Sequence, residues 1–224
     1  MHCSTCSKIV KPVVAIDIDG TLGDYHGHFL RFAAEYLGED LDVLFTASLN
    51  MYGGDESFGD YVCRHFHIDR SVYRDIKLSY RQGGMKRSMP IFPSAQSICN
   101  MVTREGAELW ITTTRPYLSL DNVVPDTVAW MDRHTIGFDY ILFDADKYAV
   151  LADRVDSERV VAVLDDLGEM YDAAEEQFGA GVPILIGGKF NRKVQRFTKR
   201  SLREAEQHVQ PRIRWWKEQH GGQS

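Results

Sequence analysis

Short apolar runs alternate with longer amphipathic stretches along this chain, and the two patterns predict strands and helices in turn. Apolar runs rich in β-branched residues and too short for a helix are typical of strands buried on both faces. They place five predicted strands at residues 13–16, 108–112, 139–143, 159–164 and 182–186. Helices are expected at about 29–37, 94–105, 125–134, 169–178 and 199–219, and a loop with a short helix at 144–155. This alternation predicts an α/β fold, a Rossmann-like doubly wound parallel sheet.

The region between the first and second strands departs from this alternation. It carries short helical patterns interrupted at Gly53-Gly54 and Gly83-Gly84, has no convincing strand, and is dense in aromatic residues. We therefore expect a small helical cap inserted after the first strand. The expected divisions are an α/β core at 1–22 and 90–198, the cap at 23–89, and a basic C-terminal helix at 199–224.

Three of the predicted helices carry signals at particular residues. Gly38 follows the 29–37 helix and is expected to end it as a C-cap. Ser94 opens the 94–105 helix and can cap it, because its hydroxyl can accept a hydrogen bond from an amide of the first turn. Pro211 falls inside the last helix, where it removes a backbone hydrogen bond and can break the helix.

Composition excludes several classes of protein. The 224 residues are 44% apolar and 26% charged, as in an ordinary globular protein that can bury a core. No apolar run approaches the ~20 residues of a membrane span, and no apolar signal core opens the chain, so we expect a cytoplasmic protein with no membrane contact. Four cysteines do not indicate a disulfide scaffold, and the Cys3–Cys6 pair lacks the second pair that a zinc site normally needs.

Charge is distributed unevenly. The net charge is −6, yet residues 189–224 hold ten lysines and arginines against three glutamates. Trp215 and Trp216 lie among those cations, a combination that can stack on single-stranded nucleic acid. The alternative is a helix whose tryptophans pack back on the core. A homodimer is also among the expected states.

Chemically reactive residues follow three of the predicted strands. Asp17 and Asp19 end the first strand two residues apart, so their side chains point to the same side. Thr113, Thr114 and Arg115 follow the second, and an Asp165-Asp166 pair follows the fourth. Each group alone is common at a strand end or turn. Because ligands bind at the carboxyl ends of such strands, their joint occurrence predicts an active site there.

These residue types suit hydrolysis of a phosphate ester. That reaction needs a nucleophile, a proton donor for the leaving group, and cations that neutralise the phosphoryl oxygens. Asp17 can be the nucleophile and Asp19 the acid, while Asp165 and Asp166 add negative charge for an octahedral Mg²⁺. Thr113 offers a hydroxyl to the phosphoryl oxygens, and Lys147 offers a point charge that also restrains the carboxylates.

The sequence Asp17-Ile18-Asp19-Gly20-Thr21-Leu22 after an apolar strand resembles the first motif of the haloacid dehalogenase superfamily, most of whose members are phosphohydrolases. The resemblance makes Asp17 the nucleophile and Asp19 the acid/base, and implies that the main-chain carbonyl of Asp19 also binds Mg²⁺. Thr113 matches the second motif, with Thr112 as the alternative one residue earlier. Lys147 matches the third motif and Asp165-Asp166 the fourth; which of these two aspartates binds the metal directly stays open.

Two groups within the superfamily are similar to this chain. The segments 146–153 and 89–95 resemble the 5′(3′)-deoxyribonucleotidases, which implies a (deoxy)nucleoside monophosphate substrate. Arg115-Pro116, with Trp130 later in the chain, resembles the phosphatase domain of polynucleotide kinase, which implies a 3′-phosphatase on nucleic-acid ends and a phosphate-binding Arg115.

The remaining predictions concern the residues that bind substrate and an alternative function outside catalysis. Thr21, Thr114 and Arg115 are expected to bind substrate, and Tyr25 or another cap aromatic such as Phe29 or Tyr52 to stack on a base. A non-catalytic binding module with the same fold is the alternative outside the enzymes.

Overall fold

A single parallel sheet forms the centre of the protein. The computed structural model describes residues 10–40, 57–114, 119–187 and 196–221. All neighbouring strands are paired in parallel, in the order β3-β2-β1-β4-β5-β6. The strands are β1 (Val13–Ile16), β2 (Glu108–Thr113), β3 (Tyr140–Phe143), β4 (Val160–Asp165), β5 (Pro183–Ile186) and β6 (Thr198–Lys199). The first strand is therefore central, with β2 and β4 on either side, which brings the predicted reactive strand ends together.

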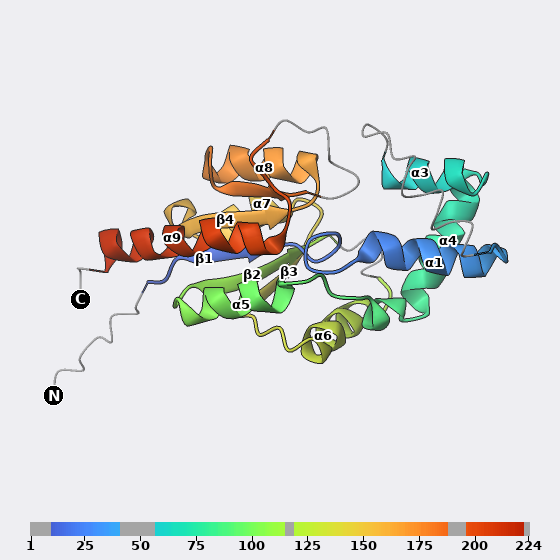
Figure 1. The fold of residues 1–224 in the computed structure, drawn as a ribbon, viewed down its shortest axis with the longest axis horizontal. Coiled ribbons are helices and arrows are strands. Elements are labelled where there is room, and N and C mark those ends of the chain that lie inside the picture. Colours follow the sequence, from blue (N-terminus) through green and yellow to red (C-terminus); the bar gives the residue numbers. More distant parts are fainter. Residues whose placement is uncertain (1–9, 41–56, 115–118, 188–195, 222–224) are drawn as a thin grey trace.

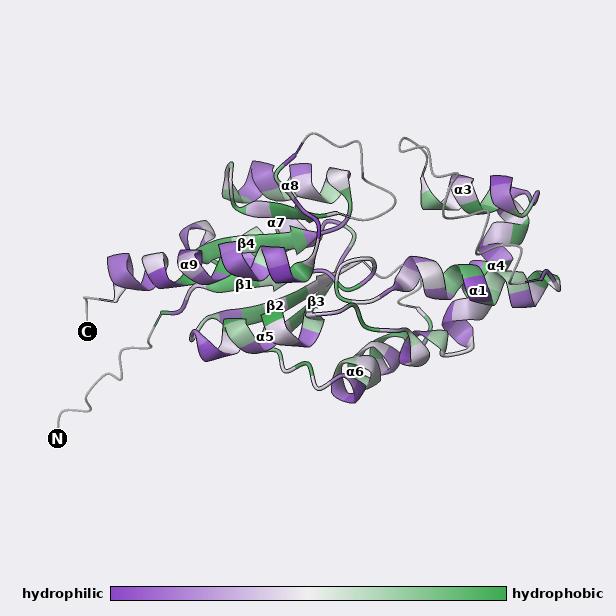
Figure 2. Cartoon of the chain, in the orientation of Figure 1, coloured by the Kyte–Doolittle hydropathy of each residue, from purple (hydrophilic) through white to green (hydrophobic). Residues whose placement is uncertain are grey.

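Helices cover both faces of the sheet (Figure 1). On one face α5 (Ala95–Arg104) and α9 (Leu202–His220) pack on the sheet, and α6 (Val123–Arg133) contributes Trp130 and Met131 to the same apolar cluster as Ile16 and Leu164. On the other face α7 (Lys147–Arg154) and α8 (Gly168–Phe178) pack on residues such as Ala15 and Val163, and η2 (Ser157–Arg159) precedes β4. The strands are the most hydrophobic part of the molecule and the outer helix surfaces the most polar (Figure 2). This is the arrangement of a doubly wound α/β fold.

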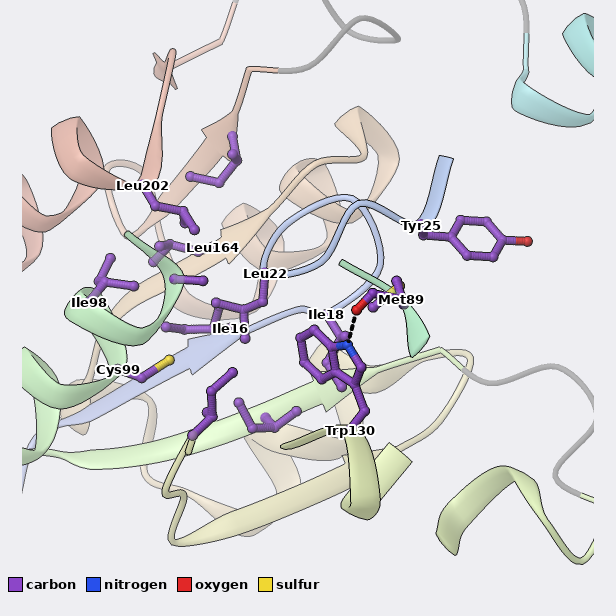
Figure 3. Close-up of a cluster of buried hydrophobic side chains, with 14 of the residues drawn as sticks. Ile16, Ile18, Leu22, Tyr25, Met89, Ile98, Cys99, Trp130, Leu164 and Leu202 are labelled. Carbon is purple, nitrogen blue, oxygen red and sulfur yellow. Dashed lines mark hydrogen bonds between the residues drawn. The ribbon is translucent and has the colours of Figure 1, made fainter. Parts of the chain in front are cut away.

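A group of helices follows β1 and extends beyond one end of the sheet (Figure 1). It consists of α1 (Tyr25–Leu37), α3 (Phe58–His65), α4 (Arg70–Gln82) and the short η1 (Met85–Ser88), which we call the cap elements. Buried cap residues such as Ile76 and Tyr80 belong to the same apolar cluster as Ile16 of β1. Figure 3 shows this cluster where the chain returns to the core, with the Trp130 indole donating to the Met89 carbonyl over 2.7 Å.

The five predicted strands are all present, and the structure corrects several details. A sixth strand, β6, lies at the edge beside β5, where residues 198–199 are too short a run to show a pattern. The helix expected from residue 29 begins one turn earlier, where the Asp24 side chain accepts a hydrogen bond from the Gly27 amide. Gly38 ends it with a φ of 72°, as predicted.

Two helix signals were read wrongly. Ser94 stands at the N-cap position of α5, but it adopts a left-handed backbone conformation and its side chain makes no capping hydrogen bond. Pro211 lies inside α9 without ending it. The last helix begins at Leu202 and not at residue 199, because the Ser201 side chain accepts a hydrogen bond from the Glu204 amide and caps it there.

Some predictions concern residues outside the described part of the chain. These are the roles of Arg115 and Tyr52, the Gly53-Gly54 interruption and the Cys3–Cys6 pair.

Candidate active site

The loop after β1 turns sharply and brings two aspartates to the strand end. The amides of Leu22 and Gly23 both donate to the Ile18 carbonyl, over 3.0 and 2.9 Å. Gly20 has a φ of 88°, which glycine adopts without strain. A Cβ atom at this position would lie 2.0 Å from Oδ2 of Asp166. Glycine is therefore required here both by the backbone and by the close approach of the β4 end.

Three buried carboxylates converge at the ends of β1 and β4. Asp17, Asp165 and Asp166 are 5%, 2% and 6% exposed, and each offers an oxygen within 4.8 Å of the others. Burial first, and then the charges of Asp165 and Asp17, hold the pKa of Asp166 well above its usual value. A divalent cation would remove this repulsion, and hard cations prefer such carboxylate oxygens. The donor set therefore fits the predicted Mg²⁺.

Lys147 lies between two of these carboxylates. Its ammonium is 2.7 Å from Oδ1 of Asp17 and 2.6 Å from Oδ2 of Asp165, and the residue is 2% exposed. Burial by itself would lower the pKa of Lys147, but Asp165 and Asp17 together outweigh it and hold that pKa well above its ordinary value. Lys147 is thus a buried, charged restraint on both carboxylates.

The two aspartates at the β4 end have different surroundings. Oδ1 of Asp165 accepts from the Leu167 amide over 3.0 Å, and its Oδ2 accepts from the Tyr148 hydroxyl over 2.6 Å as well as from Lys147. The Asp165 carboxylate is thereby occupied by the protein on both oxygens. Asp166 instead faces the Gly20 loop.

The threonines at the end of β2 lie beside β1. Ile111 is paired with Ile16, so Thr112 and Thr113 stand level with the start of the aspartate loop. Both are fully buried, and neither hydroxyl has a hydrogen-bond partner within the described residues. Successive strand residues face opposite sides of a sheet, so the two hydroxyls point to different faces. Thr113 as the phosphate-binding residue, and Thr112 as its alternative, therefore stay predictions; Thr114 is exposed.

Thr21 and Tyr25 lie in or next to the loop after β1, and both are buried inside the protein. Thr21 is fully buried, and its hydroxyl also has no hydrogen-bond partner in the described part of the chain. The Tyr25 ring is 7% exposed and packs against Phe29, Phe58 and Tyr80 of the cap elements, with ring centres 5.7 to 5.9 Å apart. Base stacking on Tyr25 stays a prediction, and in this arrangement the ring is mostly covered by cap side chains.

The cap contributes two cations that the sequence analysis missed. Arg81 of α4 donates to Oδ2 of Asp19 over 3.3 Å, and Lys86 of η1 forms an ion pair with Oδ1 of the same carboxylate. The side chains of Arg81 and Lys86 are 4% and 3% exposed. The signal was available for Arg81: it continues the buried stripe of Tyr73, Ile76 and Tyr80, where a helix normally carries an apolar residue.

Comparisons with known proteins agree with this fold. A crystal structure of a predicted phosphatase from Clostridium acetobutylicum superposes with a TM-score of 0.63 at 15% identity, covering 89% of this chain and 98% of that one. A haloacid dehalogenase-like hydrolase from Streptococcus pneumoniae superposes with a TM-score of 0.52 at 15% identity, covering 84% and 92%. The chain has the haloacid dehalogenase fold.

One curated protein extends the similarity to sequence. It is named "Putative 5′(3′)-deoxyribonucleotidase", comes from Chlorobaculum tepidum, and is 25% identical over 147 residues. The alignment covers 63% of this chain and 66% of that protein, just under two thirds of its length. No family model matches the chain. The fold and the acidic cluster are those expected from the resemblance of the first motif to the haloacid dehalogenase superfamily.

The basic C-terminal helix is a packed element of this haloacid dehalogenase fold. α9 lies against α5 and β4, with Trp216 buried and donating to the Glu158 carbonyl over 2.8 Å. Arg214 pairs with Glu105 at the end of α5, whereas Trp215 is 61% exposed. The alternative in which the tryptophans pack on the core is therefore met by Trp216 and not by Trp215, and these contacts lend no support to a nucleic-acid site. Among the described helices, none has the length and apolar character needed to cross a membrane.

Proposed function

We propose that this protein is a Mg²⁺-dependent phosphatase of (deoxy)nucleoside monophosphates that forms an aspartyl-phosphate on Asp17. The observation that carries the proposal is the convergence of Asp17, Asp165 and Asp166 beside a buried Lys147. The nucleotide as substrate is supported by the name of the curated relative.

Asp17 and Asp166 are the proposed side-chain ligands of Mg²⁺. Asp165 is proposed to position the surrounding groups without binding the ion itself. Both Asp165 oxygens already accept hydrogen bonds from Leu167, Tyr148 or Lys147. Asp166 is buried at the same point, and a bound cation would favour its charged form. The main-chain carbonyl of Asp19, which the resemblance implies as a ligand, would complete the protein ligands, and the bound ion would neutralise phosphoryl oxygens.

Two half-reactions follow from the side chains. A carboxylate oxygen of Asp17 attacks phosphorus, the bond to the leaving oxygen breaks, and Asp19 delivers a proton to that oxygen. Water then attacks the phosphorus of the aspartyl-phosphate and releases phosphate, with Asp19 taking a proton from the water. Arg81 and Lys86 of the cap elements contact the Asp19 carboxylate and would hold it in place for both roles. Lys147 keeps Asp17 oriented for attack.

The test is phosphate release from a panel of ribo- and deoxyribonucleoside monophosphates in the presence of Mg²⁺. We expect turnover that a chelator stops and that Asp17→Asn abolishes without loss of the folded state. Asp153→Asn is a matched control, since Asp153 is an exposed carboxylate on α7, and it should retain activity. Absence of phosphate release from every nucleotide would overturn the proposal and favour the binding module, whereas an active Asp17→Asn variant would exclude Asp17 as the nucleophile.

A further inference from the structure

Arg81 is a buried cation whose hydrogen-bonding capacity is largely unused. Its Nη2 atom contacts Asp19, but Nε and Nη1 are buried and have no hydrogen-bond partner among the described residues. Burying a charged donor without an acceptor costs more free energy than burying an unpaired neutral donor. This guanidinium is therefore positioned for an acceptor that the described residues do not supply.

Lys86 and Tyr25 define where that acceptor would lie. The Arg81 guanidinium carbon is 5.3 Å from the centre of the Tyr25 ring, and the Lys86 ammonium is 5.5 Å from it. Both cations also contact Asp19. Two positive groups thus meet the Tyr25 ring and the one carboxylate that is proposed to protonate the leaving oxygen.

The backbone that carries these cations is fastened to the core. The Asn122 side-chain amide donates to the Arg81 carbonyl over 2.6 Å, and the Trp130 indole donates to the Met89 carbonyl just after η1. Figure 3 shows that second bond, with Tyr25 of the cap on the far side of Met89. Because Asn122 at the N-cap of α6 and Trp130 within α6 hold the two ends of the Arg81–Met89 segment, the cations are preorganised for a ligand.

We propose that Arg81 and Lys86 form an anion subsite for the leaving group, so that preferred substrates carry a second anionic group besides the phosphate that is cleaved. The inference rests on the proposed phosphatase activity and narrows its substrate class. The two cations exceed the single charge of Asp19, and a phosphate or carboxylate has the oxygen acceptors that a guanidinium and an ammonium recognise. A nucleotide phosphorylated at both the 3′ and 5′ positions is the member of this class closest to the proposed function.

The experiment compares substrates that differ only in the second anion. Phosphate release is measured with Mg²⁺ for deoxyadenosine 5′-phosphate against deoxyadenosine 3′,5′-bisphosphate, and for ethyl phosphate against phosphoglycolate. The first pair adds a phosphate and the second a carboxylate, so the pairs distinguish the two kinds of anion. Each is run with the wild type, Arg81→Met, Lys86→Met, and the control Arg74→Met, which removes an exposed arginine from the same helix.

In at least one pair, we expect kcat/KM to be ~10- to 100-fold higher for the member that carries the second anion. This factor corresponds to one hydrogen bond to a charged group. Because both cations also contact Asp19, Arg81→Met and Lys86→Met can lower kcat/KM for both members of a pair, but each should lower it several-fold more for the member with the second anion and so reduce the preference. Arg74→Met should keep the preference. A wild type with no preference would overturn the subsite, as would cap variants that lower both members of a pair equally. Equal lowering would mean that the cations only hold the cap or contact the transferred phosphoryl group.

A binding measurement separates this inference from the proposed function. Calorimetric titration of Asp17→Asn, which cannot turn over, compares the bisphosphate with the monophosphate, and Asp17→Asn/Arg81→Met repeats the comparison. Tighter binding of the bisphosphate that the double variant loses supports the subsite even if no substrate is hydrolysed. Equal affinities, or a difference that survives in the double variant, would refute the subsite while leaving phosphatase activity on monophosphates intact.

Discussion

Replacing Lys147 with methionine is the sharpest test of the charge arrangement in the site. The substitution keeps most of the buried side-chain volume but removes the ammonium that contacts both Asp17 and Asp165. Removing one partner from a buried ion pair typically costs ~3–5 kcal/mol, because the remaining charge is left buried and uncompensated. Since Lys147 is 2% exposed and contacts two carboxylates, we expect the free energy of unfolding to fall by an amount in that range.

The assay is urea unfolding near neutral pH, with chelator and again with saturating Mg²⁺. The folded pKa of Lys147 lies well above its ordinary 10.5, so its stabilisation is complete below that ordinary value and is lost only as the pH rises through the folded pKa. Neutral pH therefore reports the full effect. Mg²⁺ should restore more stability to Lys147→Met than it adds to the wild type, because a bound cation replaces the missing positive charge.

A matched control and a refuting result complete this prediction. Lys11→Met removes an exposed lysine and should change the unfolding free energy by less than ~0.5 kcal/mol. If Lys147→Met in chelator stayed within ~1 kcal/mol of the wild type, the inferred balance of buried charge would be wrong.

Three further substitutions test other parts of the structure. Gly20→Ala should weaken Mg²⁺ binding measured by calorimetry, because its Cβ would meet the Asp166 carboxylate at 2.0 Å in a backbone with φ of 88°; unchanged affinity would exclude this role. Trp130→Phe removes the donor to the Met89 carbonyl and should lower the unfolding free energy by ~1–3 kcal/mol in urea, and an unchanged midpoint would contradict it. Hydrogen bonds from the α9 side chains lower the pKa of Glu105 from 4.5 to about 2, so wild-type stability should fall as the pH drops from 4.5 through 2. Glu105→Gln should lose that part of the acid sensitivity in pH-dependent melts, and an identical acid profile would count against the pairing.

Much of the fold could be predicted because its signals are local. Strand, helix and turn patterns depend on neighbouring residues. The central strand with Asp17 and Asp19 at its end could therefore be predicted from a short segment of sequence. Burial of Trp216 was readable too: it continues the spacing of Leu202, Ala205, Val209 and Ile213 along α9, whereas Trp215 does not. The misread Ser94 shows the limit, since its residue type suits a cap and its backbone conformation does not.

The chain itself determined which reactive groups follow which strands, and the order of those groups along the sequence. Only the tertiary structure decided which of them meet. Lys147 reaches Asp17 across 130 residues, and Arg81 reaches Asp19 across 62. Such contacts depend on strand order and on how the cap elements pack against α6, and no local periodicity encodes either. Asp165 and Asp166 are adjacent and chemically identical, yet they have different partners. Packing places Asp165 against Lys147 and Tyr148, and it places Asp166 against Gly20.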